Sequence, residues 1–355
     1  MSKPTVMIGL SGGVDSAVSA YLLQQQGYDV QALFMVNWEG DEEGYCTSAE
    51  DFQSARLVAD ELNIPLHRAN FAAEYEANVF QYFLTEYAAG RTPNPDVLCN
   101  REIKFNVFAD YAAQLGADWI ATGHYAQLRH DDNGTFLLRA PDDNKDQTYF
   151  LAAVPRERFD KVLFPIGHLT KPQVRELATR VGLPNHTRSD STGICFIGER
   201  RLREFLGTYL PAQAGDIVTV DGKRVGKHTG LMYYTIGQRK GIGVGGVRGG
   251  HATPWFVCEK NLETNQLVIT QDMQHPALMR HTLTVKQWHW LVSTPTLPFT
   301  GQARIRHRQA LQNCTVLQNG NDYTVQFEQA QWAIAAGQFV VLYDGEVCVG
   351  SGVIQ

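Results

Sequence analysis

Short apolar runs alternate with segments of helical spacing through the first part of the chain. Apolar runs predict strands at residues 6–8, 30–35, near 66 and at 119–122. Apolar residues that recur every three or four positions predict helices at residues 17–23, 48–62, 74–87 and 103–115. Alternating strands and helices predict an α/β fold with a doubly wound parallel sheet, in which ligands bind at the carboxyl ends of the strands.

The pattern changes after about residue 206. Helical periodicity fades, glycine becomes frequent between residues 237 and 250, and from about residue 283 apolar and polar residues alternate. Asn319-Gly320 and Asp344-Gly345 are pairs typical of hairpin turns. These changes predict a catalytic α/β domain at residues 1–205, a small connecting domain at 206–280 and a C-terminal antiparallel β barrel or sandwich at 281–355.

A glycine-rich turn stands between the first predicted strand and the first predicted helix. It reads Gly9-Leu10-Ser11-Gly12-Gly13-Val14-Asp15-Ser16. Glycines let backbone N–H groups approach a phosphate closely, and the dipole of the following helix favours the negative charge. The lysine of the common G-x-x-x-x-G-K-[ST] loop is missing, so this is a different kind of phosphate loop. A ligand-free tight turn is the alternative, but the strand–turn–helix context favours ATP binding.

Composition narrows the class of protein. The chain has 355 residues, of which 44% are apolar and 19% charged, as is typical of a globular protein with two or three domains. No apolar run approaches the ~20 residues that span a bilayer, and the N-terminus lacks the layout of a signal peptide. We therefore expect a cytoplasmic protein without a membrane partner. The net charge of −6 does not by itself indicate a nucleic-acid partner, although binding depends on local patches.

The cysteines are scattered, and none forms a C-x-x-C pair. This spacing argues against a structural zinc site and against a secreted disulfide framework, so we expect no metal ligands among them. Any cysteine chemistry should involve individual thiols. The six cysteines are Cys46, Cys99, Cys195, Cys258, Cys314 and Cys348.

A second motif, at residues 90–100, presents Asn94 and Asp96 on a segment that Pro93 and Pro95 make stiff. If Cys99 begins the following helix, the helix N-terminus stabilises its thiolate. A proline-rich turn with a helix-capping aspartate and a buried cysteine is an equally good interpretation of this motif by itself.

A third motif, at residues 189–198, leads through small polar residues to Gly193 and Cys195. Most cysteines between apolar neighbours are simply packed in a core. Cys195 stands out because Cys99 and the phosphate loop occur in the same chain.

The phosphate loop resembles that of the N-type ATP pyrophosphatases, which cleave ATP between the α and β phosphates and adenylate a carbonyl oxygen. The complete set of motifs resembles the tRNA-specific 2-thiouridylases of bacteria, and the resemblance covers nearly the whole chain. It rests on S-G-G-V-D-S at 11–16, N-P-D-V-L-C-N at 94–100, A-T-G-H-Y at 121–125, K-D-Q at 145–147, G-I-C-F-I-G at 193–198, and residues 230–241 and 303–309.

The resemblance implies how ATP and the target base are held. The phosphates of ATP would lie on residues 9–16, and Met35 and Gly123 would line the adenosine site. Asn94, Pro95 and Asp96 would meet the target uridine, with Asp96 as the general acid/base.

The resemblance also implies the sulfur chemistry and the RNA contacts. Cys195 would carry a persulfide, and Cys99 would be its partner nucleophile, so that the two form a catalytic disulfide. Such a bond requires Cα atoms within about 7 Å. Positions that match tRNA contacts are His124, Lys145, Asp146, Gln147, Arg306, His307 and Gln338.

The implied activity is ATP-dependent 2-thiolation of the wobble uridine, position 34, of tRNA. ATP would convert the uridine C2 oxygen into a leaving group, Mg²⁺ would accompany the ATP, and the persulfide would supply sulfur. The implied partners are the tRNAs for glutamate, glutamine and lysine, together with a sulfur-relay protein or cysteine desulfurase as sulfur donor. We expect a monomer.

Local basic groups suit an RNA partner despite the negative net charge. The two arginine clusters are Arg200, Arg201 and Arg203, and Arg304, Arg306 and Arg308. The period-two spacing of the second cluster predicts a phosphate-facing stripe on one face of a strand. A solvated charged face is the alternative.

Two other functions remain open at this point. An amide-forming synthetase could use the same ATP loop on a small metabolite, and it would need neither a cysteine pair nor an RNA-facing C-terminal domain. A non-enzymatic RNA-binding protein could also retain the nucleotide fold.

Overall fold

The computed structural model describes residues 3–38, 47–190, 202–245 and 253–355, and the structural statements that follow concern those residues. The first part of the chain forms a five-stranded parallel sheet with strand order β3–β2–β1–β4–β7. Its strands are β1 (Thr5–Gly9), β2 (Asp29–Val36), β3 (Leu66–Asn70), β4 (Trp119–Ala121) and β7 (Val162–Leu163).

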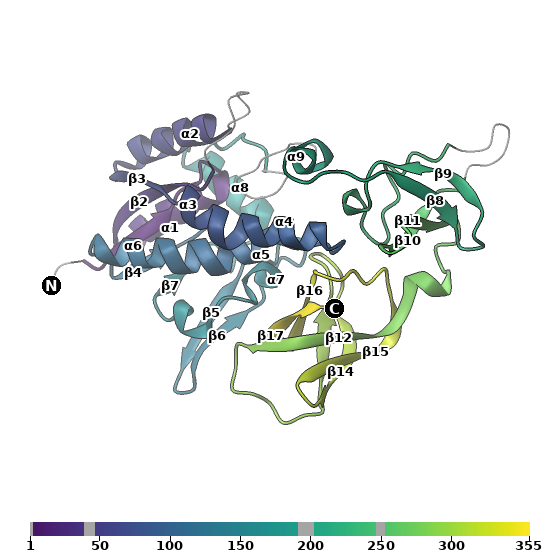
Figure 1. Ribbon diagram of the computed structural model, residues 1–355. Coiled ribbons are helices and arrows are strands. Elements are labelled where there is room, and N and C mark those ends of the chain that lie inside the picture. The colour runs from purple at the N-terminus through teal and green to yellow at the C-terminus, as the bar shows by residue number, and fades with distance from the viewer. Residues whose placement is uncertain (1–2, 39–46, 191–201, 246–252) are drawn as a thin grey trace.

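Helices cover both faces of this sheet (Figure 1). Side chains alternate along β1, so Val6 and Ile8 pack into one core and Met7 packs into the other. The first core receives α1 (Val14–Gln25), α2 (Thr47–Leu62) and α8 (Lys171–Arg180). The second receives α3 (Ala72–Tyr75), α4 (Gln81–Ala88), α5 (Pro95–Cys99), α6 (Phe108–Gln114) and α7 (Thr148–Leu151). The predicted doubly wound fold is confirmed.

The strand order reverses between β1 and β4, because β1 pairs with β2 on one side and with β4 on the other. Doubly wound sheets bind ligands at such a switch point, in the crevice beyond the strand ends. The glycine-rich turn follows β1 and Gly123 follows β4, so both lie at this point.

The helix predicted at residues 103–115 begins earlier. It starts at Pro95 and continues through the π-helical segment η2 (Asn100–Val107) into α6. Asn94 is the N-cap and Pro95 the first helical residue, where a missing N–H costs nothing and a fixed φ favours the helix. The predicted helix at 74–87 likewise consists of α3, a π-helical segment η1 (Glu76–Phe80) and α4.

The middle of the chain forms a separate four-stranded sheet with strand order β10–β11–β8–β9 (Figure 1). Its strands are β8 (Gly215–Thr219), β9 (Arg224–His228), β10 (Phe256–Asn261) and β11 (Gln266–Thr270), and α9 (Leu202–Tyr209) precedes them. Ile217, Val257 and Leu267 form the centre of its own hydrophobic core. This sheet lies within residues 206–280, and the division of the chain into three domains stays a prediction.

The C-terminal part is a closed antiparallel barrel of six strands, in which β12 pairs with both β15 and β17. Closure removes the exposed sheet edges that a sandwich would leave. Its strands are β12 (Met279–Trp290), β13 (Phe299–Arg304), β14 (Gln312–Asn319), β15 (Asp322–Trp332), β16 (Phe339–Asp344) and β17 (Val347–Ile354). Both predicted hairpins form, but the turns lie one residue later, because Asn319 pairs with Asp322 and Asp344 pairs with Val347.

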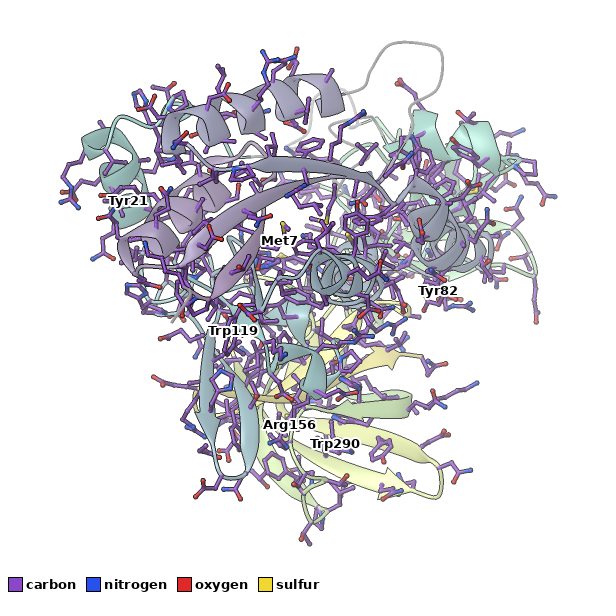
Figure 2. All side chains as sticks on the ribbon, turned by 90° about the vertical axis from the view of Figure 1, so that its left-hand side faces the viewer. Met7, Tyr21, Tyr82, Trp119, Arg156 and Trp290 are labelled. Carbon is purple, nitrogen blue, oxygen red and sulfur yellow. The ribbon has the colours of Figure 1, made fainter. Side chains whose placement is uncertain are left out.

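A hairpin from the first part of the chain extends the barrel sheet. It consists of β5 (Gln127–Asp131) and β6 (Gly134–Leu138), and Leu138 pairs with Val347 of β17. Figure 2 shows this hairpin running down beside the barrel, where Arg156 is labelled. Arg156 Nε donates to Thr135 O over 2.9 Å and so fastens the hairpin to the α/β part.

Among the described helices, none has the length and apolar character needed to cross a bilayer.

Candidate functional site

The glycine-rich turn is held in shape by its own hydroxyl groups. Ser11 N donates to Ser16 Oγ over 3.3 Å, and Ser16 Oγ donates to Gly13 O over 3.0 Å. Gly13 is the N-cap of α1 and has no side chain, so first-turn N–H groups stay available to an anion. We call residues 9–16 the phosphate cradle, after the role predicted for them.

The back of the cradle is fixed by three donors on one carbonyl oxygen. Gly12 O accepts from Ser54 Oγ at 2.7 Å, from Asn185 Nδ2 at 2.8 Å and from Arg188 Nη1 at 3.2 Å. Arg188 also forms an ion pair with Asp51 of α2. These contacts fix the orientation of the Gly12 carbonyl group.

The aspartate of the cradle belongs to a charged network. Asp15 Oδ1 accepts from Tyr125 OH at 2.8 Å and from Lys171 Nζ at 2.7 Å. Lys171 Nζ also lies 2.7 Å from Asp190 Oδ1, and Lys145 Nζ lies 2.6 Å from Asp190 Oδ2. Burial alone would raise the pKa of Asp190, but the Lys145 and Lys171 ammonium groups outweigh it and hold that pKa well below its usual range. Asp190 is therefore ionised and stays paired near neutral pH.

Met35 and Gly123 lie against the cradle. A Cβ on Gly9 would come within 3.3 Å of Met35 Cε, and one on Gly123 would come within 2.8 Å of Ser16 N. The structure thus brings together residues that were predicted to bind ATP but lie more than a hundred positions apart in sequence. Their assignment to phosphate and adenosine remains a prediction.

The segment with Asn94 and Asp96 forms a helix start. Asn94 Oδ1 accepts from Val97 N at 3.3 Å, and Asp96 lies in the first turn of α5. Cys99 is buried at the fifth residue of α5 and does not begin the helix, so the expected stabilisation of its thiolate by the helix N-terminus is wrong for this geometry. The reason is that Pro95 begins the helix one turn earlier.

Of the residues predicted to contact tRNA in the first part, His124 and Asp146 are buried, and Lys145 and Gln147 are half-buried. The His124 ring packs near Phe105 and Phe164, and burial holds its pKa well below the usual value, so the imidazole is neutral. Asp146 has no exposed surface and lies 3.3 Å from Arg304 Nη2. Gln147 Oε1 accepts from Tyr125 N at 2.9 Å.

The residues predicted to contact tRNA in the barrel hold the parts of the chain together. Arg306 Nη2 donates to Ile236 O of the middle part over 3.2 Å. His307 Nε2 lies 3.2 Å from Asp146 O, and burial lowers the pKa of this histidine. Gln338 Nε2 donates to Thr92 O over 2.8 Å.

The predicted arginine stripe is wrong. Strand β13 ends at Arg304, so Arg306 and Arg308 lie in a turn and cannot share a strand face with it. Arg304 is buried and pairs with Asp146, Arg306 is half-buried, and only Arg308 is exposed. In the other cluster, Arg203 lies over Tyr233 and Tyr234, while Arg200 and Arg201 fall outside the described residues.

Comparison with known proteins covers all three parts of the chain. Residues 4–199 match a family model described as a tRNA methyl transferase HUP domain. Residues 203–271 match a PRC-barrel domain model of the same series, and residues 280–354 match an aminomethyltransferase beta-barrel domain model.

Curated relatives match the chain from end to end. The tRNA-specific 2-thiouridylase MnmA of Nitrosomonas eutropha is 54% identical over 100% of this chain and 99% of its own length. The protein of the same name from Streptococcus mutans is 53% identical over 100% of this chain and 96% of its own length. The chain belongs to the tRNA-specific 2-thiouridylase family. This membership confirms the resemblance seen in its motifs.

The cysteine that the family resemblance singles out as persulfide carrier, Cys195, lies outside the described residues, as does most of its motif. The predicted disulfide between Cys99 and Cys195 therefore remains a prediction. The described ranges contain no cluster of three or more His, Cys, Asp or Glu side chains able to hold a metal ion.

Sequence reasoning missed Lys171. In the structure, its ammonium group pairs with both Asp15 of the phosphate cradle and Asp190. A local signal exists, because Gln173 Oε1 accepts from Thr170 N at 2.8 Å in a capping box that starts α8. That pattern places Lys171 at a helix N-terminus. Its contact with Asp15, 156 positions away, arises only in the folded chain.

Proposed function

We propose that this protein thiolates C2 of the wobble uridine of tRNA, with ATP as the activating substrate. The proposal rests on sequence identity of 54% and 53%, over the full length of this chain, to two proteins named tRNA-specific 2-thiouridylase. The phosphate cradle at the sheet switch point supports it, because the reaction needs an ATP site next to a base-binding segment.

The proposed reaction begins with adenylation. The uridine C2 oxygen attacks the α-phosphate of ATP, pyrophosphate leaves, and AMP becomes the leaving group at C2. The backbone N–H groups of residues 9–16 would hold the phosphates, and Met35 and Gly123 would border the adenosine. Asn94, Pro95 and Asp96 would hold the base, with Asp96 transferring the proton.

Sulfur transfer follows in the proposed sequence. The terminal sulfur of the Cys195 persulfide attacks C2 and AMP departs. Cys99 then attacks Sγ of Cys195, the S–S bond to the transferred sulfur breaks, and a Cys99–Cys195 disulfide remains. A thiol reductant must restore both cysteines before the next cycle.

Mg²⁺ is proposed to accompany ATP because it neutralises polyphosphate charge. Asp15 fits this ion, since it is the carboxylate of the cradle and a hard oxygen ligand. Lys171 Nζ now occupies Asp15 Oδ1 at 2.7 Å, so the ion would compete with that contact or use the other oxygen.

Further parts of the proposal concern partners and place. We propose tRNAs for glutamate, glutamine and lysine as substrates, a sulfur-relay protein or cysteine desulfurase as donor, a cytoplasmic location and a monomeric state. His124, Lys145, Asp146, Gln147, Arg306, His307 and Gln338 stay the proposed tRNA-binding set. Because Asp146 is fully buried, we assign it a positioning role within that set.

The test is nucleoside mass spectrometry of unmodified tRNA after incubation with the protein, ATP, Mg²⁺, a sulfide source and a reductant. Wild type should yield 2-thiouridine at position 34. Cys195→Ser should abolish the product but keep tRNA affinity and tRNA-dependent pyrophosphate release, because adenylation precedes sulfur transfer. Cys314→Ala, which changes a cysteine buried in the barrel core, is the matched control.

Two outcomes would favour the alternatives. Full turnover by Cys195→Ser would point to an adenylating enzyme without persulfide chemistry. Failure of tRNA to stimulate pyrophosphate release would point to a binding protein that only retains the nucleotide fold.

A further inference from the structure

The turn between β15 and β16 reaches from the barrel to the segment that precedes Asn94. Thr92 N donates to Ala336 O over 2.8 Å. Gln338 Nε2 donates to Thr92 O over 2.8 Å and to Pro93 O at 3.3 Å, across 246 positions of sequence in the first case. The barrel turn therefore binds one amide and two consecutive carbonyl groups of this segment.

Gly337 permits this close approach. Its φ is +90°, and a Cβ there would lie 3.0 Å from the N, C and O atoms of Thr92. The turn is itself fixed to β17, because Gly337 N donates to Ile354 O over 2.9 Å and Ile354 N donates to Gln338 O over 2.8 Å. The contact thus joins a turn that is anchored to the barrel to the Thr92 segment.

The same segment also meets the middle part of the chain. Thr92 Oγ1 lies 3.3 Å from Thr235 Oγ1 of that part. A cavity of about 180 Å³ lies beside Thr92 and is lined by Gly90, by Ile236 of the middle part and by Ala336 of the barrel turn, among others. Packing around Thr92 is therefore incomplete on the cavity side, and the hydrogen bonds from the barrel turn help to hold the segment in place.

A shift of Thr92 is passed on to the proposed base-binding residues. Pro93 and Pro95 restrict the backbone between Thr92 and Asp96, and Asn94 caps α5. The start of α5 therefore moves together with this segment. Misplacing a catalytic group by ~1 Å can cost about a hundredfold in rate.

We propose that Gln338 is a positioning residue, through which the barrel sets the location of residues 94–96 relative to the phosphate cradle. This inference rests on the proposed thiolation. It gives Gln338 a role beyond the tRNA contact that the family resemblance implies. The carboxamide N–H group and the close approach at Gly337 are the two features that perform this role.

The experiment compares Gln338→Met and Gly337→Ala with wild type and with Gly345→Ala. Methionine keeps the length of the side chain and loses its donor. Alanine at Gly337 pushes on Thr92, whereas alanine at Gly345, with φ +56° and open space around it, adds backbone strain without a contact. The readouts are kcat for 2-thiouridine formation at saturating tRNA and ATP, the Kd for tRNA, and Tm.

We expect Gln338→Met and Gly337→Ala to lower kcat about tenfold or more, since residues 94–96 lose their place. The Kd for tRNA should rise much less than kcat falls, because Gln338 is one of several proposed tRNA contacts and the phosphate and backbone contacts that supply most of RNA affinity are retained. Gly345→Ala should keep the kcat of wild type. If Gly337→Ala does not fold, Gln338→Met decides.

Two results would overturn the inference. One is a Gln338→Met protein with weaker tRNA binding but an unchanged kcat at saturating tRNA, which would make the side chain a tRNA contact alone. The other is an equal change of kcat in Gly337→Ala and Gly345→Ala. A wild type that forms no 2-thiouridine would instead refute the proposed function.

Discussion

A half-buried lysine lies where the middle part of the chain meets the segment at Thr92. Lys260 of β10 lines the cavity beside Thr92, and its Nζ donates to Tyr234 O over 2.9 Å. Burial lowers the pKa of this lysine to about 8. Its charge state therefore changes in an accessible pH range, which makes it a probe of this junction.

The stability of the protein should depend on pH through Lys260. Between pH ~8 and ~10.4 the unfolded chain holds a proton that the folded chain has lost, so this group makes the folded state more stable as pH rises. Lys260→Met removes that dependence. The unfolding free energy of wild type minus that of the variant should rise by about 2–3 kcal/mol over this range, because one pKa unit is worth about 1.4 kcal/mol.

Denaturant titrations of both proteins at about pH 7.5 and pH 10 would measure this difference. Lys227→Met, at an exposed position of β9, is the control. The unfolding free energy of wild type minus that of Lys227→Met should be the same at both pH values. If the unfolding free energy of wild type minus that of Lys260→Met did not change with pH, the lowered pKa of Lys260 would be contradicted.

At the scale of elements, the loop after β4 touches the start of α1 more closely than any side chain allows. A Cβ on Gly123 would lie 2.8 Å from Ser16 N and 2.9 Å from the carbonyl carbon of Asp15. Both are backbone atoms, so they cannot move out of the way as a flexible side chain could. The loop after β4 and the start of α1 are therefore in direct backbone contact, which is possible because Gly123 has no side chain.

Gly123→Ala should separate these elements and disturb the cradle. We expect KM for ATP to rise about tenfold or more, with a much smaller change in tRNA affinity, because small displacements of binding groups are costly. Steady-state kinetics with varied ATP would show it. Gly226→Ala in β9 is the control, since the nearest atoms to its added Cβ stand at an ordinary 3.5 Å or more. Equal effects in both variants would contradict the close-contact argument.

At the scale of the whole molecule, a buried ion pair fastens the barrel to the α/β part. Asp146 follows the β5–β6 hairpin in sequence, and its Oδ2 lies 3.3 Å from Nη2 of Arg304 in β13. Thr148 Oγ1 donates to Asp146 Oδ1 over 2.9 Å. Both charged side chains are almost fully buried. Arg139 Nε lies 3.7 Å from the same Oδ2 atom of Asp146. Removing Asp146 would leave the buried charge of Arg304 without the carboxylate that pairs with it.

Asp146→Asn should lower the free energy of unfolding by about 3 kcal/mol, because an uncompensated buried charge is expensive. Asp146→Leu combined with Arg304→Met should recover much of that loss, since it removes both charges. Thermal and denaturant unfolding would measure both. Lys145→Met removes a more exposed pair with Asp190 and should cost no more than about 1 kcal/mol. A loss as small as this for Asp146→Asn would contradict a structural role for the pair.

Local patterns in the sequence predicted much of the architecture, including the glycine-rich turn between β1 and α1. The order of apolar runs, helical spacing, turn residues and the S-G-G-V-D-S motif is local information, and the parallel sheet, the small middle sheet and the barrel agree with it. Errors arose where tertiary contacts override a local pattern. Period two at Arg304, Arg306 and Arg308 predicted one strand face, but the strand ends at Arg304 and the chain turns, with Arg308 at a φ of +66°. The Arg304 side chain is buried against Asp146.

The sequence by itself determined the glycine-rich turn between strand and helix and the proline-bounded segment at Asn94, because each depends on residues close together along the chain. It also determined membership of a family, through a set of such local motifs. Only the tertiary structure decided that Lys171 bridges Asp15 to Asp190 and that Gln338 of the barrel binds the Thr92 carbonyl. The physical reason is that hydrogen bonds and ion pairs act over about 3 Å in space. Chain positions that are 156 and 246 residues apart come within that distance only after the cores have packed.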